Sequence, residues 1–445
     1  MRQVRLRSAA LGDTQRMRIR QTLARASLAL MACTLMARAL ATGAVAQPVA
    51  WAEALRAASS NLEVSMASRA AAAAQADVLT ADRAPLPQLS GKLSQIDLQN
   101  GIGPGNALRD KRIDKGLGLD WTWERGDKRA LRTEAARRSA AAARADVDEV
   151  RLQQRLAAHV AFFDLLGAQE RLAQVSEIEQ GTRQLAATAA RRLQAGDLAR
   201  QDAARADIEA QRAAADTQTA RQDLARARAT LALQTGLQAS TLQARDDWPA
   251  VPQQDGGDTG LAAVVEQRAD VLAAEQRVRA GEAALGGARA LRSSDVTWGA
   301  SLDHIPGTST RQLELRLQVP LTWGHHYDGE TGRAQAQLDQ ARDQLEKTRR
   351  TAASDLQQLR GDMQSAALRE RSYREGIVPS SRDVLQRAET AYAKGALPLT
   401  DLLDARRTLR STLLEALAAR VELAKAVGAW QLRTAPTEPP LTATP

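Results

Sequence analysis

The sequence is poor in aromatic residues, cysteine and long apolar runs, and each shortage narrows the possibilities. Only 3% of the 445 residues are aromatic, which argues against a thick globular core and favours long helices packed side by side. Cys33 is the only cysteine, so a framework of disulfides within the chain is excluded. Beyond the N-terminal segment, no stretch has the roughly 20 apolar residues of a transmembrane helix. If the chain crosses a membrane, we expect it to do so with strands.

Motifs for catalysis are also missing. The sequence has no phosphate-binding loop and no zinc-binding helix motif. Among its four histidines, only His159 lies outside the region from His304 to His326. We therefore expect no enzymatic activity and no cofactor.

The excess of positive charge is confined to the N-terminal segment. The chain has a formal charge of +9, but residues 1–46 hold eight arginines and a single acid, Asp13. Without them, 53 basic residues face 51 acidic ones, a charge of +2. A nearly neutral chain gives no electrostatic reason to bind phosphate backbones, so we predict no nucleic-acid partner.

The same segment has the pattern of a secretory signal. A basic stretch is followed by an apolar run from Ala26 to Leu40 and by the small residues Ala44, Val45 and Ala46. We predict a signal peptide over residues 1–46. The alternatives are an N-terminal helix that stays attached and acylation at Cys33.

Long helical runs dominate the rest of the chain. Asp127 to Gln194 contains no proline, and about 67 residues at 1.5 Å each would form a rod of about 100 Å. A helix over Gln47–Asp82 and a return helix over Ala199–Leu233 are each much shorter. The two shorter helices could therefore stack end to end beside the long one.

The pattern occurs twice, which indicates a duplication. The turn at Ala195–Arg205 matches that at Tyr392–Asp404, with Gly196 and Gly395, Leu198 and Leu397, and Asp202 and Asp401 each 199 positions apart. The second copy predicts helices over Leu261–Leu291 and Thr331–Ala393, the latter kinked near Pro379, and a return helix. We divide the chain into a signal (1–46), a first repeat (47–245), a second repeat (246–433) and a disordered tail (434–445).

Each repeat carries two stretches in which apolar and polar residues alternate, which predict strands, and a slip of the alternation near Gln95 indicates a bulge in the first. Their ranges are Leu89–Leu98, Leu117–Arg125, Val296–Asp303 and Leu313–Gly324. One face is apolar and holds four of the seven tryptophans; the other is polar, as expected for strands between lipid and water. Four such strands cannot close a barrel, so copies must pool them. The alternative is a soluble four-stranded sheet.

Taken together, these features resemble the TolC family of outer-membrane efflux proteins. The likeness rests on the repeat spacing and on three runs, Q-R-A-D-V-L-A-A-E at Gln267–Glu275, V-P-L-T-W-G at Val319–Gly324 and Y-A-K-G-A-L-P-L-T-D-L-L-D at Tyr392–Asp404. It implies a mainly α fold of duplicated helix-strand-strand-long helix-helix units. Three copies would form a 12-stranded β-barrel in the outer membrane and a helical barrel across the periplasm.

The resemblance also implies a function. Such proteins are passive exit ducts of tripartite efflux systems, which dock onto a periplasmic adaptor and an inner-membrane pump of the RND type. The V-P-L-T-W-G-H-H-Y-D-G-E wording is most similar to the heavy-metal branch of cobalt-zinc-cadmium type, which implies export of metal cations. The alternatives are a duct of the same fold for drugs or small molecules and, from another class, a periplasmic coiled-coil adaptor or structural protein.

Site residues follow from the same resemblance. It places the channel constriction at Asp401, Asp404 and their first-repeat counterpart Asp202, where rings of acids would bind cations. The alternative for these acids is compensation of a helix dipole. The resemblance also assigns docking to the adaptor to residues of the tips. Some relatives have a basic residue at the position of Leu397 that helps to hold the tip closed, and this contact is not expected here. The assigned tip residues are Gly196, Leu198, Tyr392, Gly395 and Leu397.

His325 and His326 are weak candidates for metal ligands. They follow the fourth predicted strand, close to Asp328 and Glu330. Adjacent residues of a strand point to opposite faces, so polar side chains at the membrane interface are the other interpretation. The sequence therefore defines no confident metal site.

Overall fold

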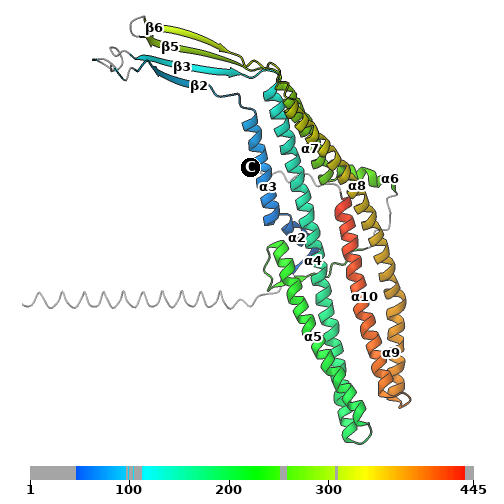
Figure 1. Cartoon of the computed structure of the whole chain (residues 1–445). Helices are drawn as coiled ribbons and strands as arrows, with labels where there is room; N and C mark the ends of the chain where they lie inside the picture. The colour runs from blue at the N-terminus through cyan, green and yellow to red at the C-terminus, as the bar shows by residue number, and fades with distance from the viewer. Residues whose placement is uncertain are drawn as a thin grey trace, which may run out of the picture.

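The computed structural model of this protein describes residues 47–96, 99, 104, 113–250, 258–305 and 309–435. The predicted signal and all but the first two residues of the predicted tail lie outside the described residues. The molecule is long, with a sheet at one end from which helices lead away (Figure 1). Both helix-to-helix turns lie at the opposite end (Figure 1).

Apart from two three-residue strands in the first repeat, the two repeats have the same order of elements. The first contains α2 (Trp51–Ala58), α3 (Leu62–Ala81), β2 (Gln88–Ser94), β3 (Asp114–Trp123), α4 (Lys128–Gln194) and α5 (Arg200–Thr235). The second contains α6 (Asp258–Gln267), α7 (Ala269–Ala290), β5 (Val296–Ile305), β6 (Ser309–Gln318), α8 (Asp328–Ser372), a π-helical turn (Tyr373–Ile377), α9 (Val378–Ala393) and α10 (Leu399–Thr434). The predicted duplication therefore describes the architecture.

The long helix α4 organises the helical part. Helices α3 and α5 pack against successive parts of it, which confirms the predicted end-to-end stacking (Figure 1). Its largest core cluster centres on Phe162 and Phe163, each at most 1% exposed, with Leu231 of α5 against them. On the other side α4 contacts α7 and α10, which in turn pack on α8 and α9. The helices thus form a single layer in which neighbours pack side by side.

The start of each repeat differs from the prediction. The helix expected over Gln47–Asp82 is preceded by a short strand and broken at Ser59–Asn61, where Asn61 caps α3 by accepting from the Val64 amide at 3.1 Å. That strand, β1 (Gln47–Val49), pairs in parallel with β4 (Leu242–Ala244) from the boundary region. The helix expected over Leu261–Leu291 is likewise interrupted at Arg268, whose backbone is extended.

The four longer strands form one antiparallel sheet in the order β2-β3-β5-β6. Its register places Leu119 opposite Leu89 and Ala300, and Trp121 opposite Trp298. One face is therefore apolar from edge to edge. Two strands are shorter than predicted, because β6 ends before Pro320, which lacks a donor N–H, and β2 ends at Ser94, just before Gln95, where φ is +58°. Residues 97 and 98, the end of the strand predicted over Leu89–Leu98, lie outside the described residues.

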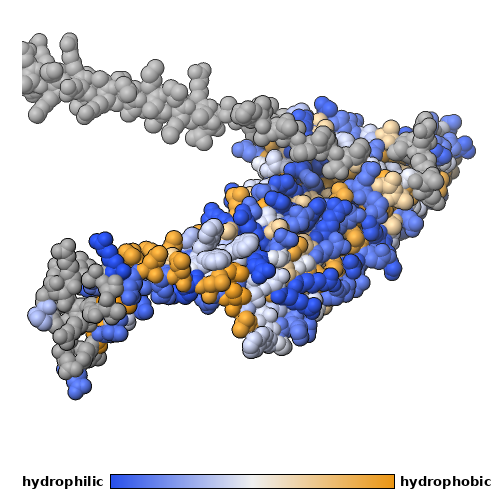
Figure 2. Space-filling view, turned by 90° about the horizontal axis from the view of Figure 1, so that it is seen from above, coloured by the Kyte–Doolittle hydropathy of each residue, from blue (hydrophilic) through white to orange (hydrophobic). Residues whose placement is uncertain are grey.

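The apolar face of the sheet is open to its surroundings. Figure 2 shows apolar side chains gathered along the part of the molecule that the strands form. On the opposite face Arg316 and Asp120 form an ion pair of 2.8 Å across Gly299, where any side chain would overlap Asp120. On the described residues of these four strands, the large apolar side chains that are more than half exposed are Leu89, Leu93, Leu117, Leu119, Trp121, Trp123, Trp298, Leu302, Leu313, Leu315 and Leu317.

Within the described ranges, every helix is too short or too polar to cross a membrane.

The long rod of the second repeat is interrupted where the sequence predicts a kink. Its π-helical turn ends at Ile377, two residues before Pro379, which lies in the first turn of α9. Proline removes a helix hydrogen bond and clashes with the carbonyl four residues earlier, and a local π turn relieves that clash. The rod of the first repeat has no such interruption.

Candidate functional site

The two helix-to-helix turns have the same backbone geometry. Gly196 (φ +82°) and Gly395 (φ +71°) adopt the left-handed conformation after the last helical turn. The amide of Asp197 bonds to the carbonyl of Arg192 at 2.8 Å, and the amide of Ala396 bonds to that of Ala391 at 2.9 Å. Both are the six-to-one bond of a Schellman motif, which needs a residue without a side-chain penalty at the glycine position. The sequence match at these turns therefore reflects identical local structure.

The tips of the two hairpins pack against each other. Leu399, Leu402 and Leu403 at the start of α10 are buried against Ala189 of α4 and Ala206 of α5. Leu198 of the first turn also lies against this cluster. Of the tip residues that we predicted for docking, Gly196 and Gly395 are exposed, whereas Leu198 and Leu397 are partly buried.

The predicted constriction acids lie on the other face of the first turns. Asp401 and Asp404 are exposed, because the intervening leucines turn toward the first hairpin. Asp404 pairs with Arg407 at 3.1 Å, whereas Asp401 accepts a hydrogen bond from Thr400 at 3.2 Å. Asp202 is partly buried, with Arg205 at 3.7 Å. The three acids are therefore not equivalent in their pairing.

Tyr392 has a basic partner, but one that the sequence did not reveal. Its hydroxyl accepts a hydrogen bond from Arg192 of α4 at 3.2 Å, and the Arg192 guanidinium lies 5.3 Å from the centre of its ring. Arg192 and Tyr392 thus connect the last turn of α4 to the last turn of α9. No basic residue at Leu397 is needed for a link between the tips.

A series of ion pairs continues this link along α10. In each pair the base is on α10 and the acid is on the first repeat, so the charges are segregated by repeat. The sequence gives no hint of these pairs, because at the repeat spacing of 199 found at the tips Glu209 corresponds to Thr408 and not to Arg407. The pairs are Arg407 with Glu209, Arg410 with Asp216, Arg420 with Glu170, Lys425 with Asp164, and Arg433 with Glu149.

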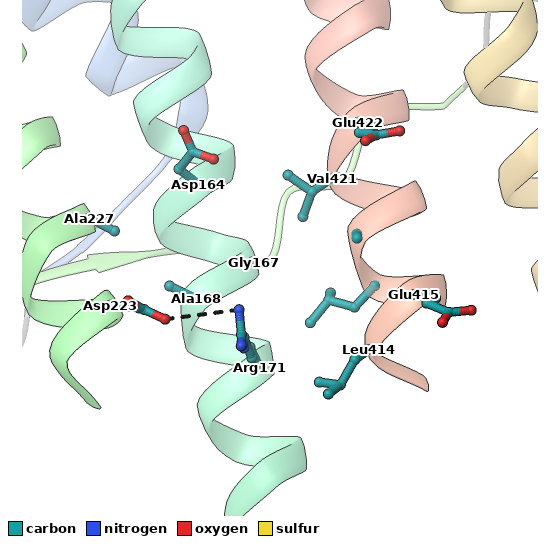
Figure 3. A pocket seen from close by; sticks show the side chains of 12 residues that line it. Asp164, Gly167, Ala168, Arg171, Asp223, Ala227, Leu414, Glu415, Val421 and Glu422 are labelled. Carbon is teal, nitrogen blue, oxygen red and sulfur yellow. Dashed lines mark ion pairs between the residues drawn. The ribbon is translucent and has the colours of Figure 1, made fainter. Parts of the chain in front are cut away.

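A groove of about 580 Å³ lies between α4, α5 and α10 (Figure 3). Its floor is apolar, and its four carboxylates all have partners: Arg171 lies 3.9 Å from Asp223, and Tyr373 donates to Glu415 at 3.1 Å. The other two pairs are Asp164 with Lys425 and Glu422 with Arg369. With its charges already paired, the groove is a seam between the repeats rather than a charged binding site.

The histidines do not form a metal site in the described part of the chain. His325 packs edge-on against Tyr327, with ring centres 4.5 Å apart, and the carbonyl of His326 accepts a hydrogen bond from Arg292. No group of three or more histidine, cysteine or acidic side chains that could hold a metal occurs among the described residues.

His159 is buried in the core. Its Nδ1 accepts a hydrogen bond from the Trp51 indole at 3.0 Å, so its Nε2 donates to the carbonyl of Lys425 at 2.9 Å. Burial lowers the pKa of this imidazole below its usual value. His159 is thus a neutral packing residue that joins α2 to α10.

Comparisons with known proteins agree with this geometry. Residues 261–432 match the family described as outer membrane efflux protein. The cobalt-zinc-cadmium resistance protein CzcC of Cupriavidus metallidurans is 24% identical over 300 residues, which cover 64% of this chain and 68% of CzcC.

Solved structures of outer-membrane channels have the same fold. The structure of CusC superposes with a TM-score of 0.75 at 19% identity, covering 86% of this chain and 91% of that one. The outer-membrane channel OprN gives a TM-score of 0.73 at 22% identity and covers 87% and 90%. The outer membrane protein VceC of Vibrio cholerae gives 0.72 at 18% and covers 86% and 95%. With its duplicated hairpins and amphipathic strands, the chain has the fold of these proteins, and its second repeat is similar to the outer membrane efflux protein family over residues 261–432.

Proposed function

We propose that this chain is one third of a passive exit duct in the outer membrane, and that the duct exports heavy-metal cations. The observation that carries the proposal is the division of the molecule into two ends. At one end an amphipathic sheet exposes leucines and tryptophans, and at the other the two hairpin tips expose polar turns and acids. Figure 1 shows that the sheet and the tips lie at opposite ends of the molecule. Apolar residues on one face and charges on the other suit strands between lipid and water.

The open edges of the molecule support assembly around an axis. Strands β2 and β6 are the two edges of the sheet, and unpaired backbone groups in lipid cost several kcal/mol each. On the same two sides, the outer helices also leave apolar side chains exposed, such as Leu62 and Leu79 on α3 and Leu368 on α8. One side of a copy therefore has to meet the other side of the next, a head-to-tail contact that closes into a ring. We take the ring to contain three copies, which is the number that the resemblance to the TolC family implies. Three copies give a barrel of twelve strands.

The helical end supports docking to other proteins. At about 100 Å, the 67-residue α4 is long enough to carry the tips far from the membrane into the periplasm. We assign contact with a periplasmic adaptor to the exposed turns around Gly196 and Gly395, next to Leu198, Leu397 and Tyr392. The adaptor would join the duct to an RND-type inner-membrane pump, which supplies the energy.

The cargo is proposed from chemistry at the tip and from one relative. Asp401 and Asp404, with Asp202 nearby, would line the mouth as acidic rings that attract cations. CzcC is named for resistance to cobalt, zinc and cadmium. A mouth with this charge suits divalent cations better than neutral compounds.

Two experiments test this proposal separately. In the first, membranes of the native host are separated by density, and the protein should be in the outer-membrane fraction. Recovery as a soluble periplasmic protein would contradict the duct and favour a coiled-coil adaptor or structural role.

In the second, a strain lacking the protein is grown with Zn²⁺, Co²⁺ or Cd²⁺ and, in parallel, with an organic dye. Sensitivity to the metals that the wild-type gene reverses is the expected result. Sensitivity to the dye alone would replace the metal cargo by small organic molecules while leaving the duct in place.

A further inference from the structure

We propose that Arg407 sets the charge of the channel mouth, because it neutralises Asp404 while a buried carboxylate of the first repeat holds it in place. This inference rests on the proposed function, since it takes Asp404 to face the passage. Arg407 would be a specificity-determining residue of the duct.

The guanidinium of Arg407 bridges two carboxylates. Its Nη1 lies 3.1 Å from Oδ1 of Asp404, one helical turn earlier on α10, and its Nη2 lies 2.5 Å from Oε1 of Glu209 on α5. The two bonds use different nitrogens of one planar group, so both form at the same time. Arg407 therefore connects an exposed acid of the second tip to the first repeat.

Glu209 fixes the position of this bridge. Its side chain is only 8% exposed, and its Oε1 also accepts a hydrogen bond from Arg212 at 3.1 Å. The hydrogen bond from Arg407 lowers the pKa of Glu209, so the carboxylate is charged at neutral pH. Removing a hydrogen-bond partner from a buried carboxylate costs free energy of folding. The hydrogen bond to Glu209 therefore holds Arg407 in position whether or not Asp404 is present.

The consequence is an uneven mouth. Asp404 is 70% exposed but has a fixed cation beside it, whereas Asp401 makes no ion pair within the described part of the chain. The negative charge offered to a passing cation is then mainly that of Asp401. The first tip shows the same arrangement in weaker form, because Arg205 lies 3.7 Å from Asp202.

The test measures block by Mg²⁺, added on the side of the helical tips, of single channels formed by the full-length protein in planar bilayers. Arg407→Gln should free Asp404 and lower the half-blocking concentration roughly two- to fivefold, the range of an exposed ion pair. Arg212→Gln is the matched control, because Arg212 bonds the same Glu209 but does not touch Asp404. It should leave the block unchanged.

Two double variants distinguish a failure of the proposed bridge at Arg407 from a failure of the proposed acidic mouth. In an Asp404→Asn background, Arg407→Gln should no longer change the block. If Arg407→Gln has no effect while Asp401→Asn with Asp404→Asn weakens the block, the bridge is wrong and the mouth stands. If the double aspartate variant also has no effect, the proposed mouth is wrong.

Assembly of the variants is checked by size-exclusion chromatography. Should Arg407→Gln fail to assemble, Arg407→Lys keeps the charge but loses the planar group whose two nitrogens bond the two carboxylates separately. It should shift the block in the same direction by a smaller factor, and an unchanged block would overturn the proposal.

Discussion

The two repeats share a topology but differ in how they are built. The long helix of the first repeat, α4, runs for 67 residues without a break and carries the aromatic core around Phe162 and Phe163. The corresponding rod of the second repeat is divided by a π-helical turn and has only small clusters, such as that of Met363 with Val427. The second repeat also carries the more exposed acids of the tips. The difference suggests a rigid scaffold in the first repeat and a more adjustable working part in the second.

The largest effect should come from the core of the scaffold. Phe163→Ala removes a ring that is 1% exposed and contacts Phe162, His159 and Trp248. We expect a loss of about 3–5 kcal/mol in stability, measured as a lower temperature of loss of helical circular dichroism. Val160→Ala, at a site 41% exposed on the same helix, should cost less than about 0.5 kcal/mol. Equal effects would contradict the scaffold role.

A smaller effect should come from the ionic core of the second repeat. Arg268, whose side chain is 6% exposed, bonds Asp270 at 2.8 Å and Asp355 of α8 at 3.1 Å. Arg268→Ala should cost about 1.5–3 kcal/mol, since these are hydrogen bonds between charged groups. Arg279→Ala removes an ion pair with Glu275 on α7, in which the Arg279 side chain is half exposed, and should cost at most about 1 kcal/mol. If the two variants unfold alike, Arg268 is not what holds the break between α6 and α7.

Acid should weaken the joint between the repeats at His159. The pKa of this buried imidazole is lowered from its usual 6.5, because burial disfavours the charged form. The unfolded chain therefore takes up a proton below about pH 6.5 that the folded chain refuses, so stability is lost as pH falls from there, by up to about 1.4 kcal/mol per pH unit. Between pH 7.5 and pH 5.5, His159→Gln should lose less stability than the wild type, and identical losses would remove His159 as a cause.

The smallest effect should come from the link between the tips. Tyr392→Phe removes the hydrogen bond to Arg192 but keeps the ring, so we expect less than about 1 kcal/mol of effect. In planar bilayers the variant should spend more time at high conductance. Tyr373→Phe loses a bond to Glu415 within the second repeat and should not change the gating. A similar change in both variants would show that the link between repeats is unimportant.

Much of the fold could be predicted from local sequence patterns. The helical pattern over Asp127–Gln194 predicts α4 to within a residue, and the glycines at positions 196 and 395 mark both turns. Alternation defines the faces of the strands. It continues past the end of β6, because a pattern of apolar and polar residues does not show that Pro320 lacks a backbone N–H for the sheet. These features depend on residues that are neighbours in sequence.

The features that could not be predicted depend on distant residues. The pairing of β1 with β4 involves only three residues of each strand, which is too few for an alternation of apolar and polar residues to be recognised. The bond from Arg192 to Tyr392 needs two turns brought together, which follows only from the packing of Leu399 and its neighbours. The pairing of Arg407 with Glu209 also required the structure, because their separation of 198 positions does not match the repeat spacing of 199 at the tips.

The central claim, that the second tip is the acidic mouth of a duct, is tested most directly by Mg²⁺ block of single channels in planar bilayers. Asp401→Asn with Asp404→Asn should weaken the block when Mg²⁺ is added on the side of the helical tips. Asp202→Asn, at the partly buried acid of the first tip, should change it less. A block that is the same in the wild type and the double variant would contradict the account.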